Sequence, residues 1–152
     1  MFRLDKRLQG DTLYLGRFPL CQALMMNDSR YPWVILVPCR NDIREYYHLS
    51  QQERAQLMEE SAWVAEKMSD FFEAKSMNVA ALGNVVAQLH VHHIARYDDD
   101  PAWPGPVWGH SPAVPFSEAE KAERVEALQD LFSSHFIDES SLHDDSDDTV
   151  YW

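Results

Sequence analysis

The sequence of 152 residues predicts one globular domain that combines several short β-strands with two α-helices. Three observations support this class. Short apolar runs flanked by turn residues occupy the first forty positions, two later segments carry a helical apolar period, and an alternating segment rich in histidine lies between those two. A chain of this length buries roughly two-thirds of its unfolded surface, so it can form its own core.

The first part of the chain predicts a β-hairpin. Residues 13–15 form a short apolar run, residues 18–26 form a second run that fits either a strand or a helical turn, and residues 33–38 are apolar throughout. The last run is rich in β-branched residues and ends at a proline, which is typical of a central strand. The polar segment 27–32 is rich in turn-forming residues, so we expect it to connect two paired strands.

Two segments carry a helix start signal. Ser50 with Glu53, and Ser117 with Glu120, match the capping box, in which the serine accepts from a free helix N–H and the glutamate bonds back. Apolar residues then recur at helical spacing to about residue 75 in the first helix and to about 136 in the second. We expect a short buried strand or turn at 78–82. The stripe of the first helix predicts core packing and comprises Leu57, Ser61, Val64, Met68 and Phe71, widened by Met58, Trp63 and Phe72.

The segment with the most potential chemistry is 83–96, Gly-Asn-Val-Val-Ala-Gln-Leu-His-Val-His-His-Ile-Ala-Arg, which holds three of the seven histidines. Successive side chains of a β-strand point to opposite faces. A strand here places Gln88, His90 and His92 on one face and His93 on the other, where we expect only packing or a structural hydrogen bond. Two imidazoles and an amide fill a core poorly, but they suit a phosphate, a metal ion or a reacting centre.

Four interpretations of this segment are open. The histidines can be hydrogen-bonded strand residues without a function, or they can bind zinc with His110, His143 or Asp98–Asp100. One histidine can attack phosphorus while the other imidazole, the glutamine and the Gly83-Asn84 turn supply donors to the phosphate. The same pocket can also bind a nucleotide without turnover. No cysteine lies nearby and no second ligand pair stands at a recognisable spacing, so we predict neither a metal nor a cofactor.

The composition argues against several classes of protein. The net charge of −12 argues against binding to nucleic acid or to an anionic membrane, although a local donor-rich site can still take a small anion. No run approaches the roughly 20 apolar residues of a membrane span, and the charged first residues do not form a signal peptide. The two cysteines, Cys21 and Cys39, lack a metal-type spacing, so we expect reduced thiols in a cytoplasmic protein.

Two regions lie outside the regular elements. Residues 97–109 contain three prolines and two tryptophans, Trp103 and Trp108, which predict an irregular loop that covers either this chain's surface or another subunit. We expect the domain to comprise residues 1–136. Residues 137–152 are acidic and predict a solvated, mobile tail.

The segment 83–92 resembles the signature of the histidine triad superfamily, which runs Gly-Gln-Ser/Thr-Val-x-His and continues with two further histidines at alternate positions. Asn27 together with residues 31–38 is similar to the family's nucleoside-contacting turn and the apolar strand after it. The helix that begins at Ser50 and the Trp103-Pro104 pair match further parts of the family. The resemblance covers the chain to about residue 133.

The resemblance implies an α+β domain with an antiparallel sheet of about five strands, one long helix and a second C-terminal helix, commonly paired as a homodimer. It implies a nucleotide hydrolase or nucleotidyl transferase that acts at the α-phosphate through a nucleotidyl-histidine intermediate. His90 then corresponds to the nucleophile, and His92 to the histidine that binds phosphate and supports the leaving group. Gln88 takes the orienting position that the family gives to its first histidine.

The resemblance also suggests which residues contact the nucleotide. Asn84 falls where the family often has a phosphate-contacting amide, and Asn27 or Asp28 falls where the ribose is held. Two positions depart from the family: Gln88 keeps a donor and an acceptor, whereas Val85 lacks a hydroxyl that can assist the leaving group. These departures suggest an alternative, a nucleotide-binding or regulatory module with little turnover.

Overall fold

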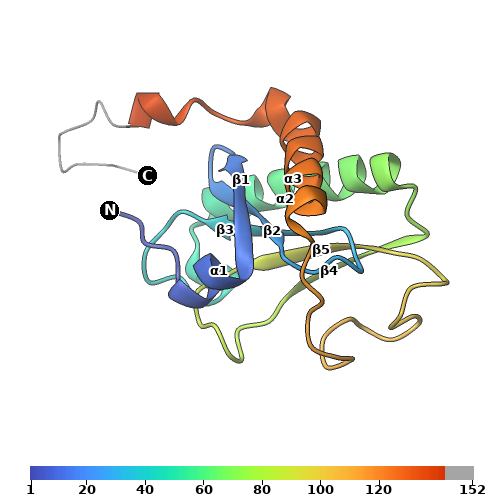
Figure 1. Ribbon diagram of the computed structural model, residues 1–152. Helices are drawn as coiled ribbons and strands as arrows, with labels where there is room; N and C mark the ends of the chain where they lie inside the picture. Colours follow the sequence, from blue (N-terminus) through green and yellow to red (C-terminus); the bar gives the residue numbers. More distant parts are fainter. Residues whose placement is uncertain (143–152) are drawn as a thin grey trace.

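Five strands form one antiparallel sheet in the order β1-β2-β3-β5-β4 in the computed structural model, which describes residues 1–142 (Figure 1). The predicted α+β class, with about five antiparallel strands, one long helix and a C-terminal helix, is confirmed. The strands are β1 (Thr12–Arg17), β2 (Cys21–Met26), β3 (Trp33–Pro38), β4 (Ser76–Ala81) and β5 (Val91–Arg96).

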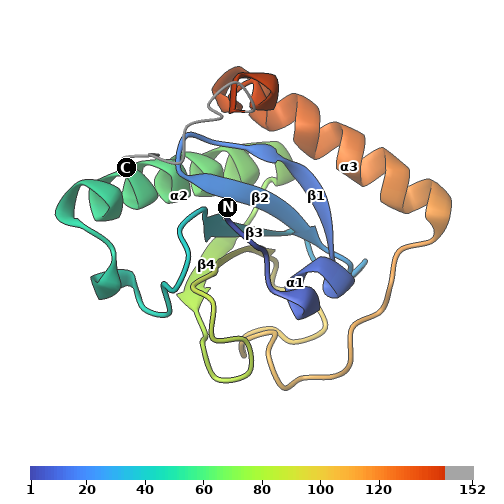
Figure 2. The ribbon, with the colours of Figure 1, turned by 90° about the vertical axis from the view of Figure 1, so that its left-hand side faces the viewer.

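Helices cover both faces of this sheet unequally. α2 and α3 lie over one face, whereas α1 and the long loop after β5 lie on the other (Figure 2). Both predicted helix starts are observed, since the side chains of Ser50 and Ser117 each accept from a backbone N–H three residues later. The helices are α1 (Lys6–Asp11), α2 (Gln51–Phe72) and α3 (Glu118–Phe132), with short 3-10 helices η1 (Tyr46–His48), η2 (Ser133–His135) and η3 (Glu139–Leu142).

The central strand β3 is buried along its whole length because both faces of the sheet are covered. Val34 and Leu36 enter the core beneath α2 and α3, while Trp33, Ile35 and Val37 enter a second core on the α1 side. Burial of both sets explains why this strand is a continuous apolar run rather than an alternating one. β3 pairs with β2 on one side and with β5 on the other, so it fixes the position of the histidine strand.

The apolar stripe on α2 is narrower than predicted, because two of its predicted members are exposed to solvent. Met58 and Phe71 are 66% and 53% exposed, and Phe72 packs against the core in place of Phe71. The predicted positions follow a seven-residue repeat, and a straight α-helix drifts by about 20° per heptad relative to such a repeat. This drift turns Phe71 towards solvent by the last turn. α2 ends at Phe72, because Glu73 adopts a left-handed backbone with φ of 51°.

Three other elements differ from the predictions. The six-residue helix α1 was not predicted, because it is too short to show a helical period. The strand expected to be buried at 78–82 is β4, which lies at the sheet edge and is half exposed because only β5 pairs with it. α3 ends at Phe132, and η2 continues the chain to His135, one residue before the expected end of the helix.

The remaining features concern the thiols and the tail. Cys21 and Cys39 are free, as predicted, and burial raises the pKa of each thiol. Within residues 1–142, no helix is long and apolar enough to cross a membrane.

The first part of the predicted tail contacts the domain, since the Ile137 N–H donates to the Arg17 carbonyl at 2.8 Å. Residues 143–152 of that tail lie outside the described residues.

Candidate functional site

His90 and His92 lie together at the start of β5, on the α1 side of the sheet. The strand begins at Val91, so His92 is a strand residue and His90 precedes it. Their ring centroids are 4.9 Å apart with an interplanar angle of 68°, and each residue is 6% exposed. The prediction of one strand carrying three site residues is therefore wrong for the strand boundary, but the two histidines do meet.

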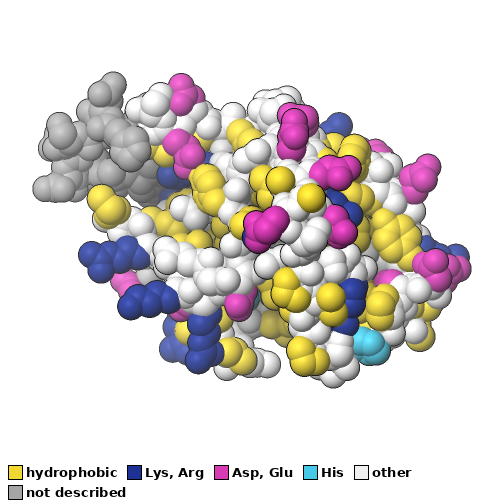
Figure 3. All heavy atoms as spheres, in the orientation of Figure 1, with side chains coloured by type: hydrophobic (Ala, Val, Ile, Leu, Met, Phe, Trp, Pro, Cys, Tyr) yellow, Lys and Arg dark blue, Asp and Glu magenta, His cyan; other side chains and the backbone are white. Residues whose placement is uncertain are grey.

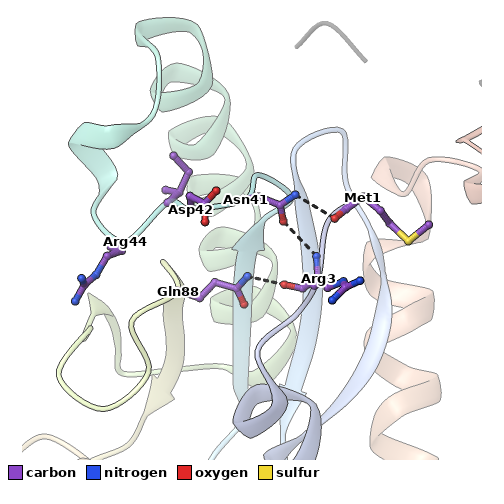
Figure 4. Close-up of a pocket in the computed structure, with 7 residues that line it drawn as sticks. Met1, Arg3, Asn41, Asp42, Arg44 and Gln88 are labelled. Carbon is purple, nitrogen blue, oxygen red and sulfur yellow. Dashed lines mark hydrogen bonds between the residues drawn. The ribbon is translucent and has the colours of Figure 1, made fainter. Parts of the chain in front are cut away.

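Gln88 contributes to this site through its backbone rather than its side chain. The side-chain oxygen accepts from the Asp5 N–H at 2.9 Å. The side-chain nitrogen donates to the Arg3 carbonyl, also at 2.9 Å (Figure 4). The backbone carbonyl of Gln88 forms the bond to His90 Nδ1, at 2.7 Å. Because the N-terminal segment occupies the Gln88 side chain, the hydrogen bond to His90 comes from the Gln88 carbonyl instead.

This carbonyl determines which nitrogen of His90 carries hydrogen. A backbone carbonyl only accepts hydrogen bonds, so His90 Nδ1 must be the protonated nitrogen. In the neutral ring the lone pair then lies on Nε2, on the side away from Gln88. An imidazole with a free lone pair and a fixed ring is what nucleophilic attack requires.

His92 has the opposite tautomer to His90, because its hydrogen-bond partner is an indole N–H. Trp33 Nε1–H donates to His92 Nδ1 at 2.9 Å, which leaves Nε2 as the protonated nitrogen. Burial, followed by the nearby His90 and His93, lowers the pKa of His92 to about 3, so the ring is neutral. The pair therefore presents a lone pair from His90 and an N–H donor from His92.

His93 points to the opposite face and bonds within the core, as expected. Its Nδ1 lies 3.3 Å from the Val34 carbonyl, and its Nε2 lies 2.7 Å from Ser61 Oγ on α2. The carbonyl assigns the hydrogen to Nδ1, so Nε2 accepts from the serine hydroxyl. Burial lowers the pKa of His93 to about 4. His93 therefore belongs to the core and not to the candidate site.

The loop between β4 and β5 carries the predicted phosphate ligand. Asn84 and Val85 are exposed on it, and Val85 is 75% exposed. A cavity of about 20 Å³ lies beside His90 and is lined in part by Gly83 and Arg44. Such a cavity holds about one water molecule. The cavity itself is therefore too small for a nucleotide.

The predicted ribose ligands lie at the far end of β5. They belong to the β2–β3 turn, which is adjacent to Ala95, because the Ala95 N–H donates to the Pro32 carbonyl. Asn27 Oδ1 accepts from the Phe116 N–H at 3.1 Å. Asp28 is 2% exposed, and both of its oxygens accept from the Arg30 guanidinium. The oxygen of Asn27 is therefore bound to the segment before α3 and the oxygens of Asp28 to its own turn, and none of these hydrogen bonds links them to His90 or His92.

Positive charge gathers around the N-terminal segment, although the whole chain is acidic. Figure 3 shows Lys and Arg side chains clustered on the side where the N-terminus and α1 lie in Figure 1. A groove of about 610 Å³ runs between this segment and the turn after β3, and Arg3, Arg44 and Gln88 line it (Figure 4). Arg44 and Gln88 also line the small cavity beside His90, so the two hollows adjoin.

The other candidate residues show no arrangement for a metal. Among residues 1–142, no group of three His, Cys, Asp or Glu side chains is placed to hold an ion. His110 is exposed, and Asp100 is bound to Arg96 by two hydrogen bonds of 2.8 and 2.9 Å. His143, the other candidate ligand, lies outside the described residues.

The loop tryptophans cover this chain's own surface. Trp108 packs against His92, with ring centroids 5.2 Å apart, and the Arg96 guanidinium lies 5.7 Å from the centre of the Trp103 ring. The sequence patterns do not indicate that Trp33 or Trp108 contacts a histidine. Trp33 lies on the strand that pairs with the histidine strand, but only the tertiary structure shows that its N–H points at His92.

Comparison with known proteins identifies relatives of this chain. The model of the HIT domain family matches residues 7–99. A crystal structure of a histidine triad protein from Marinobacter aquaeolei VT8 is 50% identical, with a TM-score of 0.86, and the match covers 89% of this chain and 98% of that one. A histidine triad (HIT) protein from Sinorhizobium meliloti 1021 is 43% identical, with a TM-score of 0.82 and coverage of 90% and 98%.

More distant structures share the fold alone. Plasmodium falciparum diadenosine triphosphate hydrolase is 15% identical, with a TM-score of 0.61, over 90% of this chain and 84% of that one. No curated protein matches the sequence. The family model spans more than half of the chain, and both bacterial histidine triad proteins match nearly their full length. The chain therefore belongs to the HIT domain family, which includes nucleotide hydrolases and transferases.

Proposed function

We propose that this protein is a nucleotide hydrolase or nucleotidyl transferase in which His90 attacks the α-phosphate of a nucleotide. The observation that carries the proposal is that two adjacent histidines have hydrogen-bond partners that require opposite tautomers. His90 Nε2 offers a lone pair because Nδ1 is bound to the Gln88 carbonyl, and His92 Nε2 offers an N–H because Nδ1 accepts from Trp33. A nucleophile beside a neutral donor is the minimum that phosphoryl attack requires.

The rest of the site supplies the phosphate contacts in this proposal. Asn84 and the backbone N–H groups of its loop would stabilise the negative charge that develops on phosphorus. Because the cavity beside His90 holds about one water molecule, substrate binding requires this loop to open. Asn27 would contact the ribose through its amide nitrogen, since its oxygen is already bound to the Phe116 N–H.

The alternative is a nucleotide-binding module with little turnover. Val85 favours it, because this position of the loop offers no hydroxyl to the leaving group, and the close burial of both histidines also favours it. The two functions share a pocket and differ in the covalent step. The hydrolase should form a covalent nucleotidyl adduct with its substrate, whereas the binding module should keep the mass of the unmodified protein.

The test is intact-mass spectrometry after the protein is mixed with an adenosine phosphoramidate. The wild type should gain a nucleotidyl group or release AMP, and His90→Ala should do neither while still binding AMP. His110→Ala, which changes an exposed histidine, is the matched control and should behave as the wild type. Turnover that survives His90→Ala would refute the nucleophile, and AMP binding without adduct or release in the wild type would favour the binding module.

We also propose that the protein forms a homodimer. β4 is an edge strand, and no strand among the described residues pairs with its outer edge, where Val79 is 49% exposed. An uncovered edge can accept a strand from a second copy. Sedimentation velocity should show a dimer, and Val79→Lys should shift it towards monomer. A wild-type protein that sediments only as a monomer at high concentration would contradict this proposal.

A further inference from the structure

Trp33 directs the polar atom of its side chain at His92. In the β3–β5 register Trp33 lies opposite Ile94, so its indole reaches along the sheet to the histidine two positions away, with a bond of 2.9 Å. Trp108 packs edge-to-face against both rings, with centroid distances of 6.2 and 5.2 Å. Trp33 is 6% exposed, so this three-ring cluster is closed to solvent on the Trp33 side.

The indole can only donate, at any ordinary pH. Its N–H neither accepts a hydrogen bond nor ionises, so the atom that faces it must carry a lone pair. His92 Nδ1 must therefore be unprotonated, and the hydrogen of the neutral ring lies on Nε2. A residue that can both donate and accept would permit either tautomer, and Trp33 removes that choice.

The same contact opposes a positive charge on His92. A doubly protonated imidazole would place an Nδ1–H against the indole N–H, which would lose the hydrogen bond and bring two donors together. Burial already disfavours the charged ring, and His90 and His93 are the titratable groups that act on it further. Its other two ring neighbours, Trp33 and Trp108, do not titrate.

We propose that Trp33 is a positioning residue that holds His92 as a neutral Nε2–H donor to an oxygen of the substrate phosphate. The phosphate as acceptor rests on the proposed function, but the tautomer does not. A neutral imidazole that accepts from Trp33 would become an anion if it gave up its remaining proton, so His92 binds without transferring one. His90 Nε2 then forms the N–P bond, the bond from phosphorus to the leaving group breaks with its electron pair, and water supplies the proton that the leaving group takes.

The first experiment measures the tautomer directly, without nucleotide. In uniformly ¹⁵N-labelled wild-type protein, a scalar coupling across the hydrogen bond should join Trp33 Nε1 to His92 Nδ1. Long-range ¹H–¹⁵N spectra should show His92 as the Nε2–H form, and His90 and His93 as Nδ1–H forms when neutral. Absence of the coupling, or a His92 ring protonated on Nδ1, would overturn the proposal even if no variant folds.

The second experiment compares Trp33→Phe with Trp108→Phe as a matched control. Removing the Trp33 donor should let His92 populate both tautomers, whereas Trp108→Phe should leave the Nε2–H form intact. The His93 signals report that the β3–β5 pairing survives in both variants. With adenosine phosphoramidate at pH 7, AMP release by Trp33→Phe should be slower than by the wild type, because only part of its His92 is then in the Nε2–H form. An unchanged His92 spectrum in Trp33→Phe would overturn the proposal, and a protein that never turns over would refute only the proposed function.

Discussion

Acid is expected to destabilise this protein steeply, because two neighbouring histidines are buried in their neutral forms. Burial is the main cause that lowers the pKa of His92 to about 3 and that of His93 to about 4, from an ordinary 6.5. Between about pH 6.5 and pH 4 the unfolded chain therefore binds protons that the folded chain does not. The free energy of unfolding falls as the pH falls through this window.

The size of the effect follows from proton linkage. Each proton bound only by the unfolded state costs about 1.4 kcal/mol per pH unit below the unfolded pKa. Between pH 7 and pH 5 each histidine then removes about 2 kcal/mol, and the pair removes about 4 kcal/mol. Since small domains are stable by roughly 5–15 kcal/mol, this loss is a large share of the total.

Urea unfolding followed by tryptophan fluorescence at pH 7, 6 and 5 measures this loss. His93→Gln removes one of the two groups, so its unfolding free energy should fall by about 2 kcal/mol less between pH 7 and pH 5 than that of the wild type. His110→Gln changes an exposed histidine and should show the full wild-type loss. Equal losses in the wild type and in His93→Gln would refute the claim that burial keeps His93 neutral.

Two further predictions concern packing and a buried ion pair. Gly16→Ala would place a Cβ 2.6 Å from the Phe136 ring and should cost about 1–3 kcal/mol, whereas Gly10→Ala meets open space in α1 and should be neutral or slightly stabilising in the same urea assay. Arg96→Met should cost about 3–5 kcal/mol, because it leaves the buried Asp100 carboxylate without its guanidinium partner; a change below about 1 kcal/mol would refute this expectation.

Local sequence patterns determined the elements whose signal is contained within a few residues. The apolar run of β3, the polar turn before it and the serine caps of α2 and α3 follow from side-chain alternation, turn chemistry and unsatisfied helix N–H groups. The spacing of His90 and His92, together with the glycine-containing turn before them, indicated one site and one family. The sequence patterns did not predict the six-residue helix α1 or the start of β5, because so few residues show no period.

Only the tertiary structure decided how the site residues are used. Gln88 lies at the family's first triad position, yet its side chain binds residues 3 and 5, which are more than eighty positions away in sequence. The protonated nitrogen of each histidine depends on a partner: the Gln88 carbonyl for His90 and the Trp33 indole for His92. Strand pairing brings Trp33 and His92 together across 59 positions, and no pattern within either segment specifies that contact. The sequence therefore determined which imidazoles meet, whereas long-range pairing determined which nitrogen of each one can attack and which can donate.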